Sequence, residues 1–276
     1  LALTACDFTP EPPQRAEQKP SELAVPLRAA NAEAAELYRV VETYFDQYLA
    51  LNPIRASELG DHRFDDRFGD YLSMSWMADS LGIEQESLEK LAAIDPKRLA
   101  GEDLVTYAAF KRQRELGIGG YRYPSELLAI NPCSNWPGAF ARLGSGKGAH
   151  PFRTTRDYDS FLARMDGFVV WVDQAINNLR AGVTKGVVLP QDLVERTLPQ
   201  LEAFGRLEDP RQTVFWQPLL NFPAGPSVAD RRRLLQAYDE KLRTKVLPAY
   251  RRLHDYLAQE YLPAARTTVS WSDLPS

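Results

Sequence analysis

The stretch DYDSFLARMDGFVVWVDQAINNLRAG, residues 157–182, carries the clearest structural signal in the chain. Its large apolar side chains recur every three or four positions, which is the spacing of one face of an α-helix. That face comprises Phe161, Met165, Phe168, Val172, Ile176 and Leu179. Asp157 suits the cap at the start, and Gly182 suits a left-handed stop at the end. The sequence therefore predicts a long helix, buried along one side, over about 157–181.

The same periodicity extends in both directions along the chain. Helices are expected over about 31–52, 75–94, 102–116, 190–204 and 228–261. Pro53 is expected to end the first of these and Pro248 to kink the last, while Ser227 and Asp230 form a predicted capping box. No run alternates in the manner of a strand, so the expected fold class is all-α, an array of long packed helices.

Two of these helices have predicted inward faces. In 31–52 the face comprises Leu37, Val40, Val41, Tyr44, Phe45, Tyr48 and Leu49, and in 75–94 it comprises Met77, Leu81, Leu88 and Leu91. Helical spacing fails from 117 to 151, because glycine, proline, asparagine and serine are frequent in GIGG, NPCSNWPG and GSGKG. An irregular segment of this length in a compact protein often carries function.

The composition is typical of a globular protein with a substantial core. Hydrophobic residues make up 44% of the 276 residues and charged residues 25%. The formal net charge of −4 does not favour a nucleic-acid partner, and none is expected. No apolar run approaches the roughly 20 residues that a membrane-spanning helix needs.

The start of the chain, LALTACDF, predicts a lipid anchor. Leu3-Thr4-Ala5-Cys6 resembles the site at which bacterial lipoprotein signal peptidase cuts before a lipidated cysteine. Residues 1–5 are then the remnant of a signal peptide, and the proline-rich residues 6–28 are a tether between membrane and folded body. The alternative is a cysteine near a frayed terminus. The lipoprotein interpretation places the protein in the bacterial cell envelope, attached to the membrane through Cys6 and facing the periplasm.

The residues that could carry chemistry do not add up to a complete active site. The three histidines are His62, His150 and His254; HExxH is absent, and we predict neither catalytic residues nor metal ligands in this chain. LGSGKGAH lacks the first glycine and the Ser/Thr of a phosphate-binding loop. His62 is flanked by Asp61, Asp65 and Asp66, which suits either a proton relay or a polar loop whose aspartates cap turns.

Four segments resemble successive blocks of one bacterial family, catalogued as domain of unknown function 885. They are NPIRASELGDHRFDDRFGDYLS, LAAIDPKRLAGEDLVTYAAFKRQRELGI, LRAGVTKGVVLPQDLVERTLPQLE and VLPAYRRLHDYLAQEYLPAARTT, in that order. The resemblance runs from about residue 28 to the end and makes 29–276 one helical domain. It implies an all-helical, gluzincin-type zinc metallopeptidase of about twice this length, many members being lipoproteins. The zinc motif belongs to the family's C-terminal half, so this chain corresponds to the N-terminal half and is expected to be inactive alone.

The resemblance implies that such a half forms one wall of a cleft for short peptides, with zinc held by the other half. The candidate substrate-binding residues are His62, Asp65, Tyr121, Tyr123, Asn131, Asn135, Trp136 and Arg142. Tyrosine and tryptophan offer apolar faces with a polar handle, and arginine can pair with a carboxylate. The alternative is a non-catalytic helical periplasmic lipoprotein that binds a partner or ligand. An exposed apolar flank would favour the first interpretation.

Overall fold

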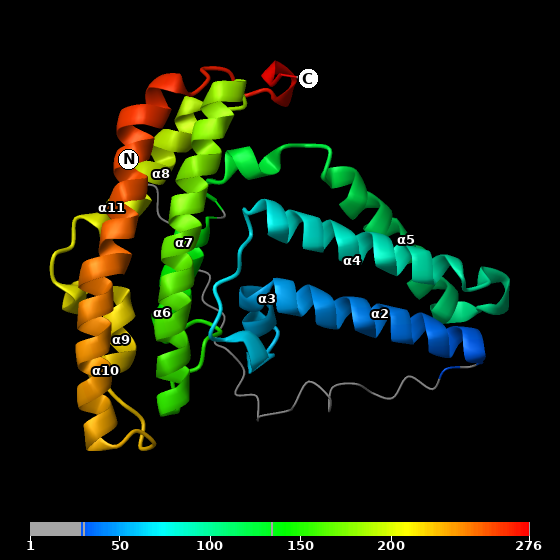
Figure 1. The fold of residues 1–276 in the computed structure, drawn as a ribbon, viewed down its shortest axis with the longest axis horizontal. Helices are drawn as coiled ribbons and strands as arrows, with labels where there is room; N and C mark the ends of the chain where they lie inside the picture. The colour runs from blue at the N-terminus through cyan, green and yellow to red at the C-terminus, as the bar shows by residue number, and fades with distance from the viewer. Residues whose placement is uncertain (1–28, 30, 134, 276) are drawn as a thin grey trace, which may run out of the picture.

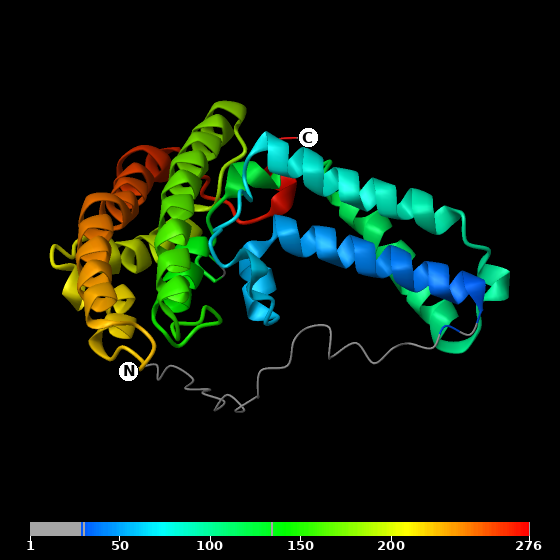
Figure 2. The same cartoon turned by 60° about the horizontal axis from the view of Figure 1, so that its bottom comes forward.

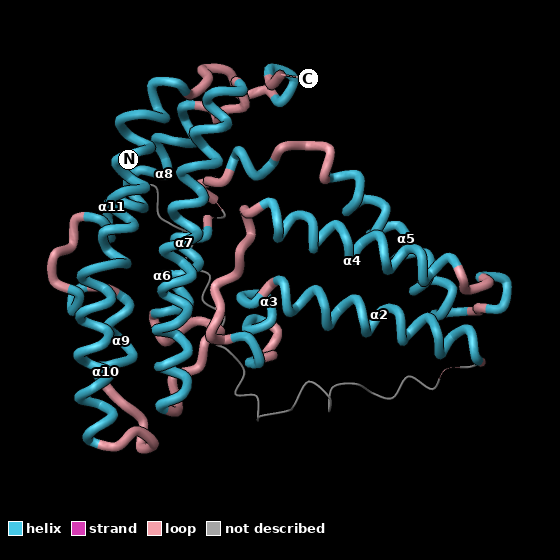
Figure 3. Tube along the Cα trace, viewed as in Figure 1, coloured by secondary structure: helices cyan, strands magenta, loops and turns pink. Residues whose placement is uncertain are grey.

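The computed structural model describes residues 29, 31–133 and 135–275. The predicted signal-peptide remnant, the lipidation site at Cys6 and the tether all lie outside these residues. The described residues form helices joined by loops, with no strand among them, so the predicted all-α class is confirmed (Figure 3).

The long helix predicted from residues 157–182 is the centre of the molecule. It is α7, Thr155–Lys185, and Phe161, Met165 and Phe168 on its predicted face are fully buried. Thr154 and Asp157 form a capping box at its start. The predicted stop at Gly182 is wrong: the helix continues to Gly186, which has the left-handed φ of 72°. Gly182 is needed instead for packing, because a Cβ there would lie 2.6 Å from the carbonyl oxygen of Val187.

Further helices pack around α7, directly or through one another, to form what we call the body. They are α3 (Pro53–Glu58), α6 (Trp136–Gly144), α8 (Gln191–Gly205), α9 (Gln217–Leu220), α10 (Val228–Lys241) and α11 (Leu247–Tyr256). The predicted capping box of Ser227 and Asp230 starts α10. The final helical run continues through π-helical turns at Leu242–Val246 and Leu257–Tyr261, and Pro248 lies in the first turn of α11. The extra backbone residue of a π-turn accommodates the proline without ending the run.

Three helices extend away from the body as an arm. They are α2 (Ala32–Leu51), α4 (Met74–Ala92) and α5 (Gly101–Gly120), which lie side by side and point away from α7 (Figures 1 and 2). The arm has its own small core, which includes Leu37, Val40, Tyr44, Leu91 and Phe110. Pro53 ends α2 as predicted, but it also begins α3.

Short 3-10 turns complete the described secondary structure. They are His62–Phe64, Pro96–Arg98, Ser125–Leu128, Pro210–Gln212, Val214–Trp216, Leu262–Ala264 and Trp271–Asp273.

The inward face predicted for α4 is confirmed only in part: Leu91 is buried in the arm core and Leu88 packs against that core. Met77, Leu81 and Leu88 are only half-buried, whereas the buried positions are Ser80, Glu84, Ser87 and Leu91. Two of these polar side chains accept hydrogen bonds from distant segments, since Tyr44 donates to Glu84 and Tyr121 donates to Ser80. In α2, Phe45 is predicted inward but is 46% exposed.

The irregular segment predicted from 117 to 151 is shorter than expected. The helix α5 continues through GIGG to Gly120, and α6 begins inside NPCSNWPG. Asn135 caps α6 by accepting a hydrogen bond from the Gly138 N–H, and Pro137 fits its first turn. The ring of Phe140 then stacks on Phe168 of α7, with 4.3 Å between centroids. The cap and the buried aromatic ring account for helix formation in a region rich in helix breakers.

Candidate functional site

A cavity of about 380 Å³ lies where the arm meets the body, and we call it the junction cavity. The arm contributes side chains of α4 and the last turn of α5. The segments that connect arm and body contribute the rest. The lining comprises Tyr71, Leu72, Trp76, Met77, Glu84, Gly117, Gly120, Tyr121, Tyr123, Ser125 and Glu126. Its volume falls within the range of small-molecule binding sites.

The glycine-rich end of α5 makes room for this cavity. A Cβ on Gly117 would lie 3.1 Å from the Glu84 carboxylate, so only glycine leaves that carboxylate its full space. The helix ends directly afterwards, where the Tyr121 N–H donates to the Ile118 carbonyl. Tyr121 and Tyr123 therefore leave the helix beside the cavity rather than on the arm's outer surface.

Aromatic rings form much of the cavity wall, and hydrogen bonds hold several of them. The Tyr71 ring stacks on Trp136 at 4.2 Å and meets Trp76 edge-on at 5.7 Å. The Trp76 indole N–H donates to the Leu51 carbonyl, and the Tyr121 hydroxyl donates to Ser80. Tyr123 is 65% exposed and lies at the open side. The predicted residue Trp136 thus supports the wall from behind Tyr71.

Glu84 is the buried charged group of the lining, at 9% exposure. Its Oε1 accepts a 2.9 Å hydrogen bond from the Tyr44 hydroxyl, and its Oε2 lies 3.2 Å from Arg114 Nε without a hydrogen bond. The Arg114 guanidinium in turn lies 3.7 Å from the centroid of the Tyr44 ring. Burial raises the pKa of Glu84 to about 7, while the adjacent guanidinium favours the ionised carboxylate.

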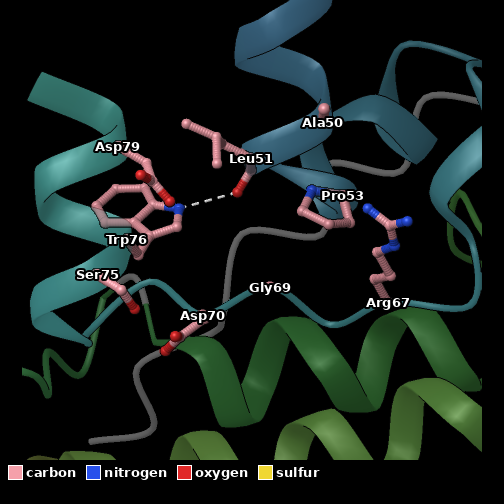
Figure 4. A pocket seen from close by; sticks show the side chains of 9 residues that line it. All are labelled: Ala50, Leu51, Pro53, Arg67, Gly69, Asp70, Ser75, Trp76 and Asp79. Atoms are coloured by element: carbon pink, nitrogen blue, oxygen red, sulfur yellow. Dashed lines mark hydrogen bonds between the residues drawn. The ribbon is translucent and has the colours of Figure 1, made fainter. Parts of the chain in front are cut away.

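A second, smaller cavity of about 190 Å³ shares Trp76 with the junction cavity. Figure 4 shows its lining, with the hydrogen bond from the Trp76 indole to the Leu51 carbonyl. The charged side chains around it are Arg67, Asp70 and Asp79. Trp76 therefore lines both cavities, and its hydrogen bond to the Leu51 carbonyl fixes the indole between them.

The predicted residues His62 and Asp65 lie together in a different place, on the body. His62 Nδ1 is 2.9 Å from Asp65 Oδ2, and Asp65 also accepts hydrogen bonds from Ser57 and from Arg164. The hydrogen bond with Asp65 raises the pKa of His62. Burial opposes ionisation of Asp65, but the hydrogen bonds from His62 and Ser57 and the charge of Arg164 hold its pKa below the usual range.

Arg164 of α7 is the centre of this network and is fully buried. It donates to the carbonyls of Arg67 and Phe64, and its Nη1 lies 3.2 Å from Nδ1 of His150. Burial, and then the charge of Arg164, lower the pKa of His150 to about 4. The network ties the loop that contains His62 to α7. The burial of Arg164 could have been predicted from the sequence, because Arg164 lies three residues after Phe161, on the buried face of α7.

The other predicted residues are spread over the surface. Asn131 accepts a hydrogen bond from the Cys133 N–H in an exposed turn, and Asn135 caps α6 while donating to Gln200. Arg142 lines a separate cavity with Lys147. The structure therefore brings Tyr121, Tyr123 and, indirectly, Trp136 together, and separates them from the rest of the predicted set. Sequence reasoning missed Glu84, Trp76 and Tyr71.

In residues 29, 31–133 and 135–275, no group of three or more His, Cys, Asp or Glu side chains is placed to hold a metal ion. Within the same residues, no helix combines the length and apolar character of a membrane span.

Comparison with known families gives a match, and comparison with curated proteins gives none. The model of a family described as bacterial protein of unknown function (DUF885) matches residues 53–275, from the start of α3 to the last described residue. The match covers the body, both connecting segments, α4 and α5, and thus every residue that lines the junction cavity. The chain therefore belongs to the bacterial DUF885 family.

Proposed function

We propose that this chain is the substrate-binding wall of an envelope-anchored zinc metallopeptidase that acts on short peptides. The junction cavity carries the proposal, because it offers aromatic faces, a buried carboxylate and a serine hydroxyl between two helical units. Such a combination suits a peptide, whose apolar side chains and polar backbone need both kinds of surface. The peptidase activity itself rests on the resemblance described above.

Exposed large apolar side chains on α5 support the same proposal. Leu104, Val105 and Leu116 are 42%, 67% and 57% exposed, although large apolar side chains of a helix are ordinarily packed. Only Phe110 and Arg114 of this 20-residue helix are buried. Exposed apolar side chains, here interleaved with the charged Arg112 and Glu115, suit contact with a further helical layer, as a two-sided cleft requires.

The zinc implied by the resemblance does not fit the residues described here, which offer no suitable ligand cluster. Under the proposal its ligands come from residues outside this chain. When bound there, zinc would supply an activated water and a polarised carbonyl. The role of the present residues is to bind and orient the peptide and to exclude larger substrates from the cleft.

The test is zinc-dependent peptide hydrolysis by the full-length gene product. A library of short fluorogenic peptides is incubated with that product after chelation and again after zinc is restored, with the present chain as a control. We expect hydrolysis only by the full-length product and only with zinc, and an HExxH-like motif in the coding frame beyond Ser276. A full-length product without that motif, or without zinc-dependent hydrolysis, overturns the proposal. Binding without hydrolysis would favour the non-catalytic periplasmic lipoprotein instead.

The anchor is tested separately at Cys6. We expect the wild-type precursor to be recovered in the membrane fraction and to incorporate labelled fatty acid in bacterial cells. Cys6→Ser should abolish both, whereas Cys133→Ser, at the exposed second cysteine, should change neither. Fatty-acid incorporation by Cys6→Ser would contradict the lipoprotein assignment.

A further inference from the structure

The chemistry of the junction cavity selects one kind of ligand. We propose that this cavity binds a protonated primary amine joined to an apolar group, such as the amino-terminal end of a short peptide or a lysine side chain. The amine site is argued from the cavity alone, and only its assignment to a peptide substrate rests on the proposed function.

The charges of the lining have one sign. Glu84 and Glu126 line the cavity, and none of the described lining residues is lysine, arginine or histidine. Arg114 pairs with Glu84 from the side of the arm core and is not part of the lining. Glu126 is half-buried and forms no ion pair within the described part of the chain. A bound cation would therefore meet the carboxylate of Glu126 and the ionised form of Glu84, whereas no cationic group of the lining would attract an anion.

The hydrogen-bonding capacity of Glu84 is only partly used. Its Oε2 is buried and accepts no hydrogen bond, even though Arg114 Nε is 3.2 Å away. A buried carboxylate oxygen without a donor is costly, so a ligand that brings a donor relieves that cost. An ammonium group has three N–H donors and no acceptor, which suits a wall of carboxylates and hydroxyls.

The aromatic rings suit the rest of the ligand. Tyr71, Trp76 and Tyr121 are positioned by stacking or by hydrogen bonds, so their faces are available at small entropic cost. Rings of this kind attract a cation and pack against an attached apolar group. Tyr123, at 65% exposure, is placed to cover the ligand from the open side.

The primary test compares amines with their acetylated forms. Binding of leucyl-phenylalaninamide, N-acetyl-leucyl-phenylalaninamide and N-acetyl-lysinamide to the full chain is measured by isothermal titration calorimetry at pH 7. We expect one or both of the free amines to bind at least about tenfold more tightly than the acetylated dipeptide amide, because acetylation removes the charge. Preference for the dipeptide amide assigns the site to a peptide amino terminus, and preference for N-acetyl-lysinamide assigns it to a side chain. Equal or tighter binding of the acetylated dipeptide amide overturns the proposal.

Variants locate the binding in this cavity. Glu126→Gln should weaken amine binding about three- to tenfold without changing the thermal midpoint, since Glu126 forms no ion pair with described residues. Tyr123→Ala should also weaken it, because the exposed ring covers the ligand. The matched control is Glu89→Gln, at an exposed α4 carboxylate outside the cavity, which should leave binding unchanged. Unchanged binding in Glu126→Gln and Tyr123→Ala overturns the assignment to this cavity.

The two proposals fail in different ways. If amines bind at the cavity but the full-length product cleaves no peptide, the amine site is supported and the peptidase function is contradicted. If the full-length product shows zinc-dependent hydrolysis but the chain shows no preference for a free amine, the peptidase function is supported and the amine site is contradicted.

Discussion

The arm and the body each bury a charged cluster among packed helices, but different contacts stabilise the two clusters. In the body, Arg164 is surrounded by hydrogen-bond acceptors from the chain around it and by a large aromatic core. In the arm, Glu84 and Arg114 depend on Tyr44 and on each other, within a core built from only three helices. The arm therefore has less apolar burial to offset the cost of its charges, and we expect it to open locally while the body stays folded.

The largest expected effect follows from removing the arginine of the body. Arg164→Met leaves Asp65 without its buried cation, the Arg67 carbonyl without a donor and the Phe64 carbonyl with only the Arg67 N–H, so we expect a loss of about 3–5 kcal/mol in the free energy of unfolding. Chemical denaturation measures it. Arg156→Ala, at an exposed position in the first turns of α7, should cost less than about 0.5 kcal/mol. Similar losses in the two variants would contradict the role given to Arg164.

A smaller and more local effect is expected in the arm. Arg114→Met should cost about 2–3 kcal/mol, because Glu84 loses its ion pair but can take up a proton near neutral pH. Hydrogen exchange should show faster exchange in α2, α4 and α5, with α7 and α11 unchanged. Arg112→Ala, exposed on the same helix, is the control. Uniform acceleration in both regions would show that arm and body unfold as one unit.

The stability of the two regions should respond to pH in opposite directions. The folded pKa of Glu84, about 7, lies above its unfolded value, so the folded arm holds the extra proton and loses stability as pH rises from 5 to 7. The folded pKa of His150, about 4, lies below its unfolded value, so the body gains stability as pH rises from 4 to 6.5. Each effect should be on the order of 1–2 kcal/mol.

The groups in direct contact with Glu84 and His150 agree with these signs, and the raised pKa of His62 opposes the trend of the body only above about pH 6.5. Glu84 faces Tyr44 of α2, Arg114 of α5 and Tyr121, none of which changes charge between pH 5 and 7. His150 faces Arg164, Asp65 and the Asp157 carbonyl, and the lowered pKa of Asp65 adds to the acid sensitivity of the body. Hydrogen exchange at pH 5 and pH 7, corrected for intrinsic rates, measures the two regions separately. A shift of both regions in one direction would contradict the assignment.

The smallest expected effect is the change in stability when one of two glycines, each with open space around it, is replaced by alanine. Gly82, inside α4, has ordinary helical φ, and a Cβ added there would meet no atom within 4 Å, so Gly82→Ala should stabilise the arm by about 0.5–1 kcal/mol. Gly60, after α3, has the same open space but a φ of 85°, so Gly60→Ala should destabilise the body by about 1 kcal/mol. Thermal midpoints of the two variants should therefore move in opposite directions.

The difference between arm and body also explains which features of the fold can be predicted from the sequence. The apolar face of α7 follows helical spacing over its whole length, so periodicity predicts its burial residue by residue. The buried face of α4 is polar, and its satisfaction depends on Tyr44 and Arg114, which lie 40 and 30 positions away in the chain. Hydrophobic periodicity contains no information about such partners, so it predicts Met77 and Leu81 inward and misses Ser80, Glu84 and Ser87.

The candidate site shows the same limit. Tyr121 and Tyr123 are predictable because tyrosines in a glycine-rich segment suit binding. Glu84 and Trp76 escape prediction because they lie in a helix, where a carboxylate and an indole resemble ordinary surface and core residues. They join the tyrosines only because α4 and α5 pack together, with the first half of α4 beside the end of α5.

The most direct test of the account is whether a short peptide binds between arm and body. Hydrogen exchange is measured on the full chain with and without saturating leucyl-phenylalaninamide. The account predicts slower exchange on both sides of the junction cavity, in residues 76–84 and 117–126, with α10 unchanged. Unchanged exchange on both sides at saturation, or protection confined to the loop around His62, would contradict it.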